Sequence, residues 1–187
     1  MLSDTLTFLI NIFFSLLGIV LIVRAWAYAI RLHAFNPWTQ TLWRLTDWLV
    51  QPVRRLVGPG NRIDWPSLLA CWLAALAYLL LSWLIVTGRL PDIQSVVPLL
   101  VAALLTMARW AFNVVLWGVL IQAILSWVNP MAPIMPTLTT LTAPLLNPIR
   151  RILPHLGGID LSPLVLLVIA QVAMMVLQHM AFILFGV

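Results

Sequence analysis

The sequence has 187 residues, of which 63% are hydrophobic and only 8% are charged. A soluble domain keeps about a quarter of its residues charged to wet its surface, so this composition excludes an ordinary soluble domain and favours a few membrane-spanning helices. The net charge of +5 comes from arginines dispersed beside apolar segments, which is typical of contact with anionic lipid headgroups and not of nucleic-acid binding.

A first apolar run extends from Thr5 to Ile30, long enough as a helix to cross a hydrocarbon core of about 30 Å. Its leading residues include Asp4 and no basic residue, and the run is too long for a cleavable signal peptide, so we expect a retained spanning helix. Arg24 lies inside its far end. Its side chain either extends to the interface or forms an intramembrane charge facing a water-filled pathway.

An amphipathic connection follows at residues 38–57. Apolar side chains recur at spacings of three, four and seven residues, at Trp38, Leu42, Leu45, Leu49 and Leu56, while Gln40, Arg44, Asp47, Gln51, Arg54 and Arg55 fall on the opposite face. This pattern predicts a helix in the headgroup plane, which Pro52 kinks or divides. It is either a passive connector or a docking surface for a partner or for anionic lipid.

The second span is predicted at residues 66–88, and the third lies between Ile93 and Trp127, interrupted only by Arg109. Counting back about 20 residues from Trp127 reaches the neighbourhood of Arg109, which we therefore place near the outer interface. The residues before Arg109 form a protruding or interfacial lead-in. The third span is accordingly taken as about 98–128, with Arg109 as a second candidate intramembrane charge.

A second connection, residues 134–154, carries Pro136, Pro144 and Pro148 and is less polar than the first. It lies at the interface, or it dips into the membrane where protein or water satisfies its backbone. The fourth span is predicted at residues 161–185.

An internal repeat relates the two halves of the chain. Pro52-Val53-Arg54-Arg55-Leu56 returns 96 residues later as Pro148-Ile149-Arg150-Arg151-Ile152, and other pairs share that offset: Leu45-Thr46 with Leu141-Thr142, Ile63-Asp64 with Ile159-Asp160, and Leu68 with Leu164. We therefore expect an all-α, polytopic membrane protein with four transmembrane helices. They form two parallel repeats of span, amphipathic connection and span, at residues 1–92 and 93–187.

The arginines predict the orientation. They are concentrated between spans one and two and between spans three and four, whereas the termini have none. The positive-inside rule places both arginine-rich connections in the cytoplasm and both termini outside it, which in a bacterial inner membrane means the periplasm.

The repeat also carries a family resemblance. The segment from Thr142 to Pro154, TAPLLNPIRRILP, followed by Gly157-Gly158-Ile159-Asp160-Leu161-Ser162-Pro163, resembles the signature of the YggT (YlmG) family, and the two-repeat length resembles its Gram-negative members. The first half departs from the pattern at residues 58–62. Gln122 stands near a position where family members often carry arginine, before Ser126-Trp127.

The resemblance implies a multi-spanning membrane protein without an established catalytic activity. Relatives are associated with osmotic stress tolerance, with genes near the division cluster and with thylakoid membrane assembly in plastids, and these associations do not converge on one mechanism.

The candidate binding residues are the paired arginines Arg54, Arg55, Arg150 and Arg151, whose guanidinium groups suit phosphate. Charge pairing and topology determination are the alternative roles. Asp64 and Asp160 precede spans two and four, each with a proline following, and are expected to cap those helices or to pair with the arginines.

No catalytic, cofactor or metal motif is recognisable, and His33, His155 and His179 are too dispersed for a haem. The sequence therefore predicts a non-enzymatic organising or assembly protein without a cofactor. Its expected partners are membrane lipids and possible membrane proteins or further copies of itself. The alternative is an ion channel or transport component of osmotic stress tolerance, for which polar residues hint at a stripe: Asn11, Ser15, Asn113, Gln122, Gln171 and Gln178.

Overall fold

The structure is a computed structural model that describes residues 2–32, 37–58, 63–153 and 160–185. Its elements are, in chain order, α1 (Leu2–Ala29), α2 (Pro37–Val57), α3 (Trp65–Thr87), the 3-10 helix η1 (Ile93–Ser95), α4 (Val96–Val128), α5 (Met135–Ile152) and α6 (Ser162–Phe185). The described ranges contain helices and no strand, and the prediction of an all-α fold is confirmed.

Within the described ranges, four helical stretches are long and apolar enough to cross a membrane: α1, α3, η1 with α4, and α6. Many of their large apolar side chains, such as Phe8, Phe13, Trp117 and Met175, are exposed on the outside of the molecule. A surface of this kind is stable in lipid and would be unfavourable in water. The chain is a multi-pass membrane protein, as its composition predicts.

Local sequence explains where α3 begins and ends. Pro66 occupies the first turn, where the missing N–H is not needed, and Asp64 stands at the N-cap position. Gly88 ends the helix with φ of 66°, a left-handed conformation that glycine adopts without strain, and its N–H bonds to the Leu84 carbonyl.

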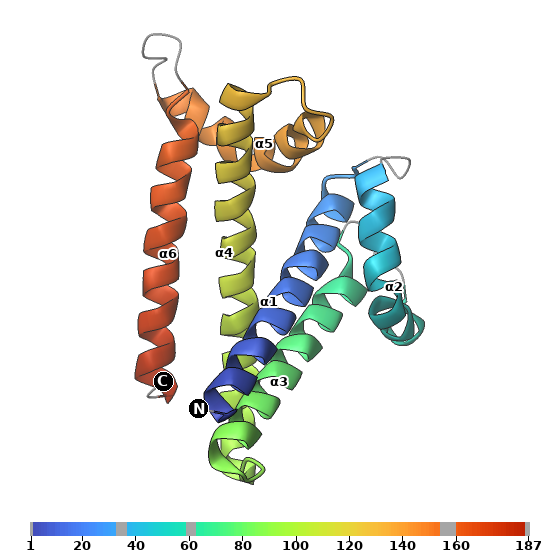
Figure 1. Cartoon of the computed structure of the whole chain (residues 1–187), viewed down its shortest axis with the longest axis vertical. Coiled ribbons are helices and arrows are strands. Elements are labelled where there is room, and N and C mark those ends of the chain that lie inside the picture. Colours follow the sequence, from blue (N-terminus) through green and yellow to red (C-terminus); the bar gives the residue numbers. More distant parts are fainter. Residues whose placement is uncertain (1, 33–36, 59–62, 154–159, 186–187) are drawn as a thin grey trace.

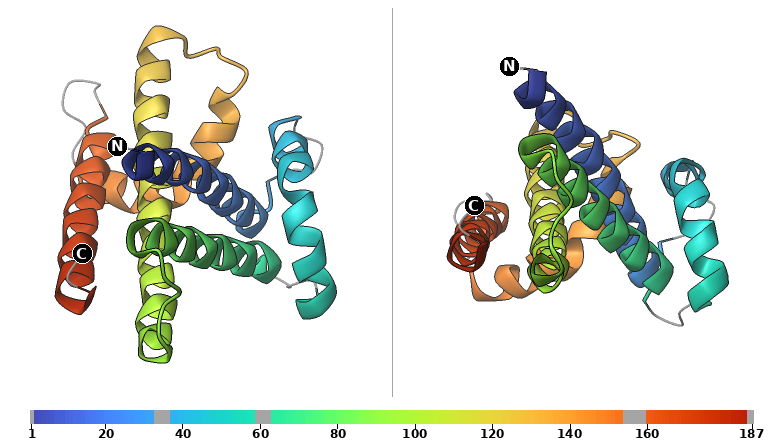
Figure 2. Two further views of the ribbon diagram at one scale, coloured as in Figure 1. Left: turned by 60° about the horizontal axis from the view of Figure 1, so that its bottom comes forward. Right: turned by 90° about the horizontal axis from the view of Figure 1, so that it is seen from below.

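The helices pack around α4, which contacts α1, α3, α5 and α6. Figure 2 shows α6 on one side of α4 and the α1–α3 pair on the other, with α2 along the outer side of that pair. The first turn of α1 and the last turn of α6 lie at one end of the molecule, and α5 lies at the other (Figure 1). Because α2 and α5 each join the far ends of two long helices, both arginine-rich segments lie away from the termini.

Small residues bring α1 and α3 together. The core between these helices contains Leu21 of α1 with Ala70, Cys71, Ala74 and Ala75 of α3, all buried. Small side chains allow close helix approach, which supplies van der Waals contact where lipid provides no hydrophobic driving force.

Among the contacts that join the predicted halves, two are specific to single side chains. Gly18 of α1 packs directly against the indole of Trp110 in α4, and a Cβ on Gly18 would overlap that ring. Trp26 of α1 donates its Nε1–H to the Leu141 carbonyl of α5 at 3.1 Å. The two halves are therefore linked both in the apolar core and at the arginine-rich end.

Candidate functional site

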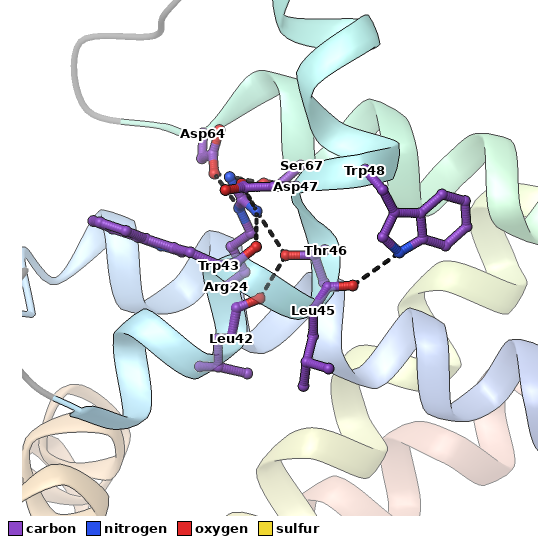
Figure 3. Close-up of polar contacts among 9 residues, drawn as sticks. All are labelled: Arg24, Leu42, Trp43, Leu45, Thr46, Asp47, Trp48, Asp64 and Ser67. Atoms are coloured by element: carbon purple, nitrogen blue, oxygen red, sulfur yellow. Dashed lines mark hydrogen bonds and ion pairs between the residues drawn. The ribbon is translucent and has the colours of Figure 1, made fainter.

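Arg24 is buried at the point where α1, α2 and α3 meet. Its Nη1 lies 2.6 Å from Thr46 Oγ1, 2.7 Å from Asp47 Oδ1 and 3.4 Å from the Trp43 carbonyl oxygen (Figure 3). Its Nε lies 3.8 Å from Asp64 Oδ2, which is within ion-pair range but too far for a hydrogen bond. One guanidinium group thus faces two carboxylates.

Asp64 completes this cluster from the start of α3. Its side chain is 5% exposed, and its Oδ2 accepts a 2.5 Å hydrogen bond from the Ser67 hydroxyl. Although Asp64 occupies the N-cap position, its carboxylate makes no hydrogen bond to a backbone N–H of the first turn. The carboxylate instead binds side chains of the cluster, so it joins α3 to α1.

The position of the Arg24 side chain differs from the first of the two positions that we expected from the sequence. An arginine near the end of a span was expected to extend to the interface. Instead the side chain is only 5% exposed, because α2 covers it and supplies Thr46 and Asp47 as partners. A buried charge requires such partners, since an unpaired one would carry a large desolvation penalty.

The second half contains an uncharged counterpart. Thr142 of α5, the repeat partner of Thr46, donates its hydroxyl to the Gln122 side-chain carbonyl of α4, and both residues are buried. Gln122 therefore occupies in α4 the role that Arg24 has in α1. An amide needs no carboxylate to balance it, so Asp160 is free to bind elsewhere.

Asp160 binds Arg150 of α5. Arg150 Nη2 and Nε each lie 2.8 Å from Asp160 Oδ2, and Asp160 Oδ1 accepts the Ser162 N–H at 3.0 Å. Partial burial raises the pKa of the Asp160 carboxyl, but the hydrogen bonds from Ser162 and Arg150 outweigh burial and hold the pKa below its ordinary value. Asp160 thus both contacts the start of α6 and forms an ion pair.

The remaining candidate arginines are exposed. Arg54 and Arg55 lie in the last turn of α2, Arg151 lies in the last turn of α5, and Arg109 lies within α4. None of the four forms an ion pair with another residue in the described ranges. Of the two arginine pairs in the repeat, only Arg150 is matched by a carboxylate among the residues that the structure describes.

No group of three or more histidine, cysteine, aspartate or glutamate side chains that could hold a metal ion occurs among the described residues. His33 and His155 lie outside the described residues, as does the Gly157-Gly158 part of the signature. Cys71 is buried in α3, with its Sγ 3.8 Å from the Gly18 carbonyl oxygen.

Two segments of the chain, residues 3–99 and 101–181, match the family model described as CCB3/YggT. The chain belongs to the CCB3/YggT family. It is 34% identical over 170 residues to a protein of Escherichia coli strain K12 called uncharacterized protein YggT, covering 90% of this chain and 87% of that one. A protein of Vibrio alginolyticus described by its place in the proC 3′ region is 34% identical over 172 residues, 91% of each chain. No solved structure matches the chain.

Each of the two matches to the CCB3/YggT model contains one of the two sets of polar contacts described above. The first covers α1, α2 and α3 with the Arg24 cluster, and the second covers α5 with its contacts to Gln122 and Asp160. The division of this YggT protein at residues 92 and 93 stays a prediction.

Asp47 and Ser67 are the members of the Arg24 cluster that sequence reasoning did not single out. Asp47 appeared only as part of the polar face of residues 38–57, although it directly follows the repeated Leu45-Thr46 pair. That position, next to a repeated threonine, was the available signal.

Proposed function

We propose that this CCB3/YggT protein is a non-enzymatic organising or assembly protein of the bacterial inner membrane. It binds anionic lipid or a partner protein through the arginine-rich end of its helices. The observation that carries the proposal is a set of exposed arginines on α2 and α5 without an ion pair in the described ranges: Arg54, Arg55 and Arg151. A guanidinium group fits phosphate in a bidentate geometry, and the anionic cytoplasmic leaflet attracts such clusters.

The amphipathic helices support this role. The exposed face of α2 carries Arg44, Arg54 and Arg55 beside large apolar side chains such as Trp48 and Leu56. A helix of this composition lies in the interface, with its apolar side chains in the acyl region and its arginines at the headgroups. The arginine distribution then puts this end in the cytoplasm and both termini in the periplasm.

The buried charges favour a structural role over catalysis. A catalytic acid or base needs access to a substrate. Arg24 instead pairs with both Asp47 and Asp64 where three helices meet, and Arg24 and Asp64 are almost completely covered. This arrangement stabilises the scaffold that carries the exposed arginines.

An ion channel or transport component of osmotic stress tolerance is the alternative. A channel would need a stripe of polar side chains along the spans, free to face water. Several of the polar side chains suggested for such a stripe instead form hydrogen bonds within the protein. Ser15 bonds to Asn11 within α1, and Gln122 bonds to Thr142. These contacts favour the organising role.

The test uses a photoreactive phosphatidylglycerol in vesicles of phosphatidylglycerol and phosphatidylcholine, with crosslinked peptides mapped by mass spectrometry. Replacing Arg54, Arg55 and Arg151 by alanine should lower the affinity for phosphatidylglycerol, measured from the crosslinks to α2 and α5, by on the order of 100-fold. The reason is that each arginine near an anionic leaflet contributes about 1 kcal/mol. Arg89→Ala, an exposed arginine at the other end, is the matched control and should leave these crosslinks unchanged.

Lysine at the same three positions separates two forms of lipid binding. Full recovery would indicate simple electrostatic attraction, and failure to recover would indicate bidentate recognition of phosphate. Wild-type crosslinking in the alanine variant, with unchanged co-purifying proteins, would contradict the organising role.

A further inference from the structure

A cleft of about 860 Å³ is lined mainly by the second half of α3, the first half of α4 and the last turns of α6. These parts of the helices lie toward the end of the molecule that carries the termini (Figure 1). The walls of the cleft are mostly apolar, with contributions from Leu99, Leu105 and Leu177. A volume of this size is in the range of sites for small organic ligands and far exceeds the space of a few water molecules. Apolar walls of this extent favour an apolar occupant.

Arg109 lies at this cleft with its charge unmatched. Its side chain is exposed, and it makes no ion pair with any residue that the structure describes. The cleft is also lined by Ser82 of α3 and Gln178 of α6, which belong to two other spanning helices. An arginine within a span is costly unless it meets an anion or water, and a negatively charged ligand at this cleft would balance its charge.

A second polar group at the cleft has no partner either. The Ser82 Oγ is buried and makes no hydrogen bond within the described part of the chain. Ser82 stands five residues before Thr87, the last residue of α3, which corresponds to about 8 Å of helix rise. This position lies within the acyl region, a few ångströms below the headgroups, because the 23 residues of α3 rise about 34 Å and a hydrocarbon core is about 30 Å thick.

We infer that this cleft binds an anionic phospholipid, whose phosphate meets the Arg109 guanidinium and whose acyl chain lies along the apolar wall. The Gln178 amide lies within the same cleft, and the buried Ser82 hydroxyl would reach an ester carbonyl only after its side chain turns toward the cleft. The negative headgroup matches the unpaired charge, and the acyl chain matches the apolar walls. A free phosphate ion satisfies only the first requirement. The site is at the opposite end of the spans from Arg54 and Arg55 and does not rest on the proposed function.

The probe is again photoreactive phosphatidylglycerol, now read at peptides of α4 and α6, with phosphatidylcholine and inorganic phosphate as comparisons. Wild-type protein should bind phosphatidylglycerol more tightly than phosphatidylcholine at these peptides, and inorganic phosphate should not displace it. Arg109→Ala should weaken binding about fivefold. Arg109→Lys should recover most of that loss. Arg44→Ala, an exposed arginine of α2 outside the cleft, should have no effect on these crosslinks.

Ala102→Phe provides a second route, because Ala102 lines the cleft and the larger side chain would obstruct part of it while Arg109 remains. This variant should show weaker crosslinking to α4 and α6 and keep the crosslinks to α2 and α5. Equal crosslinking in wild type, Arg109→Ala and Ala102→Phe would overturn the inference, as would displacement by inorganic phosphate. The variant with alanine at Arg54, Arg55 and Arg151 tests the proposed function separately. It should lose only the crosslinks to α2 and α5, and its result does not affect the cleft.

Discussion

Gly18 of α1 and Trp110 of α4 are in direct contact, and the indole occupies the space where any other residue at position 18 would place its Cβ. Trp110 is 3% exposed, so its ring has little room to move. The contact therefore requires glycine, for reasons of space and not of backbone conformation.

We expect Gly18→Ala to lower the free energy of unfolding by about 1–3 kcal/mol, since a methyl group forced into a packed site displaces its neighbours. Gly118→Ala is the matched control, because a Cβ on Gly118 would meet nothing within 4 Å. Thermal or denaturant unfolding in detergent measures both variants. Equal stability of the two would show that α1 and α4 do not pack as described.

Arg24→Ala should lower the free energy of unfolding by about 3–5 kcal/mol, because it leaves the nearly buried Asp64 without its cation. Arg24→Lys should recover part of this loss, since it keeps the charge but not the planar set of donors. Arg44→Ala, an exposed arginine of α2, should change stability little. If Arg24→Ala and Arg44→Ala unfolded alike, the cluster would not hold the three helices together.

The Arg150–Asp160 pair should give the protein a dependence on acidic pH. Because the folded-state pKa of Asp160 is lowered, its contribution is fully present above the unfolded pKa of about 3.9 and is lost as pH falls through the folded value. Asp160→Asn removes the contribution. The difference in melting temperature between wild type and Asp160→Asn should therefore shrink below about pH 4. A difference that stays constant with pH would rule out the ion pair as its source.

The orientation is tested with two exposed positions in a Cys71→Ser background, Leu90 near the end of α3 and Leu56 in the last turn of α2. A membrane-impermeant maleimide added to intact cells should label Leu90→Cys, and it should label Leu56→Cys only after the membrane is permeabilised. The reverse pattern would place the arginine-rich end outside the cytoplasm and would remove the basis of the proposed function.

Helix positions were predictable because each depends on local sequence. The apolar run from Thr5 to Ile30 predicts α1 at Leu2–Ala29 within a few residues, and the amphipathic pattern at residues 38–57 predicts α2 at Pro37–Val57. Length and periodicity suffice for such elements.

Partner choice was not predictable in this way. Asp64 and Asp160 are equivalent in the repeat, yet the first faces Arg24 and the second binds Arg150. The difference follows from which side chain each preceding span provides, an arginine in α1 and a glutamine in α4, and from how each helix packs on its neighbours. The Gly18–Trp110 contact likewise depends on the crossing of two helices that are distant in sequence.

The different partners of the two aspartates make the halves unequal in their sensitivity to ionic strength. The Debye length falls from about 30 Å at 0.01 M salt to about 3 Å at 1 M, and screening of this kind acts on exposed charges far more than on buried ones. The Arg150–Asp160 pair, about a third exposed on both sides, weakens as salt rises, whereas Arg24 and Asp64 are covered and keep their attraction. Concentrated salt therefore loosens the hold of α5 on the start of α6 while the junction of α1, α2 and α3 stays closed.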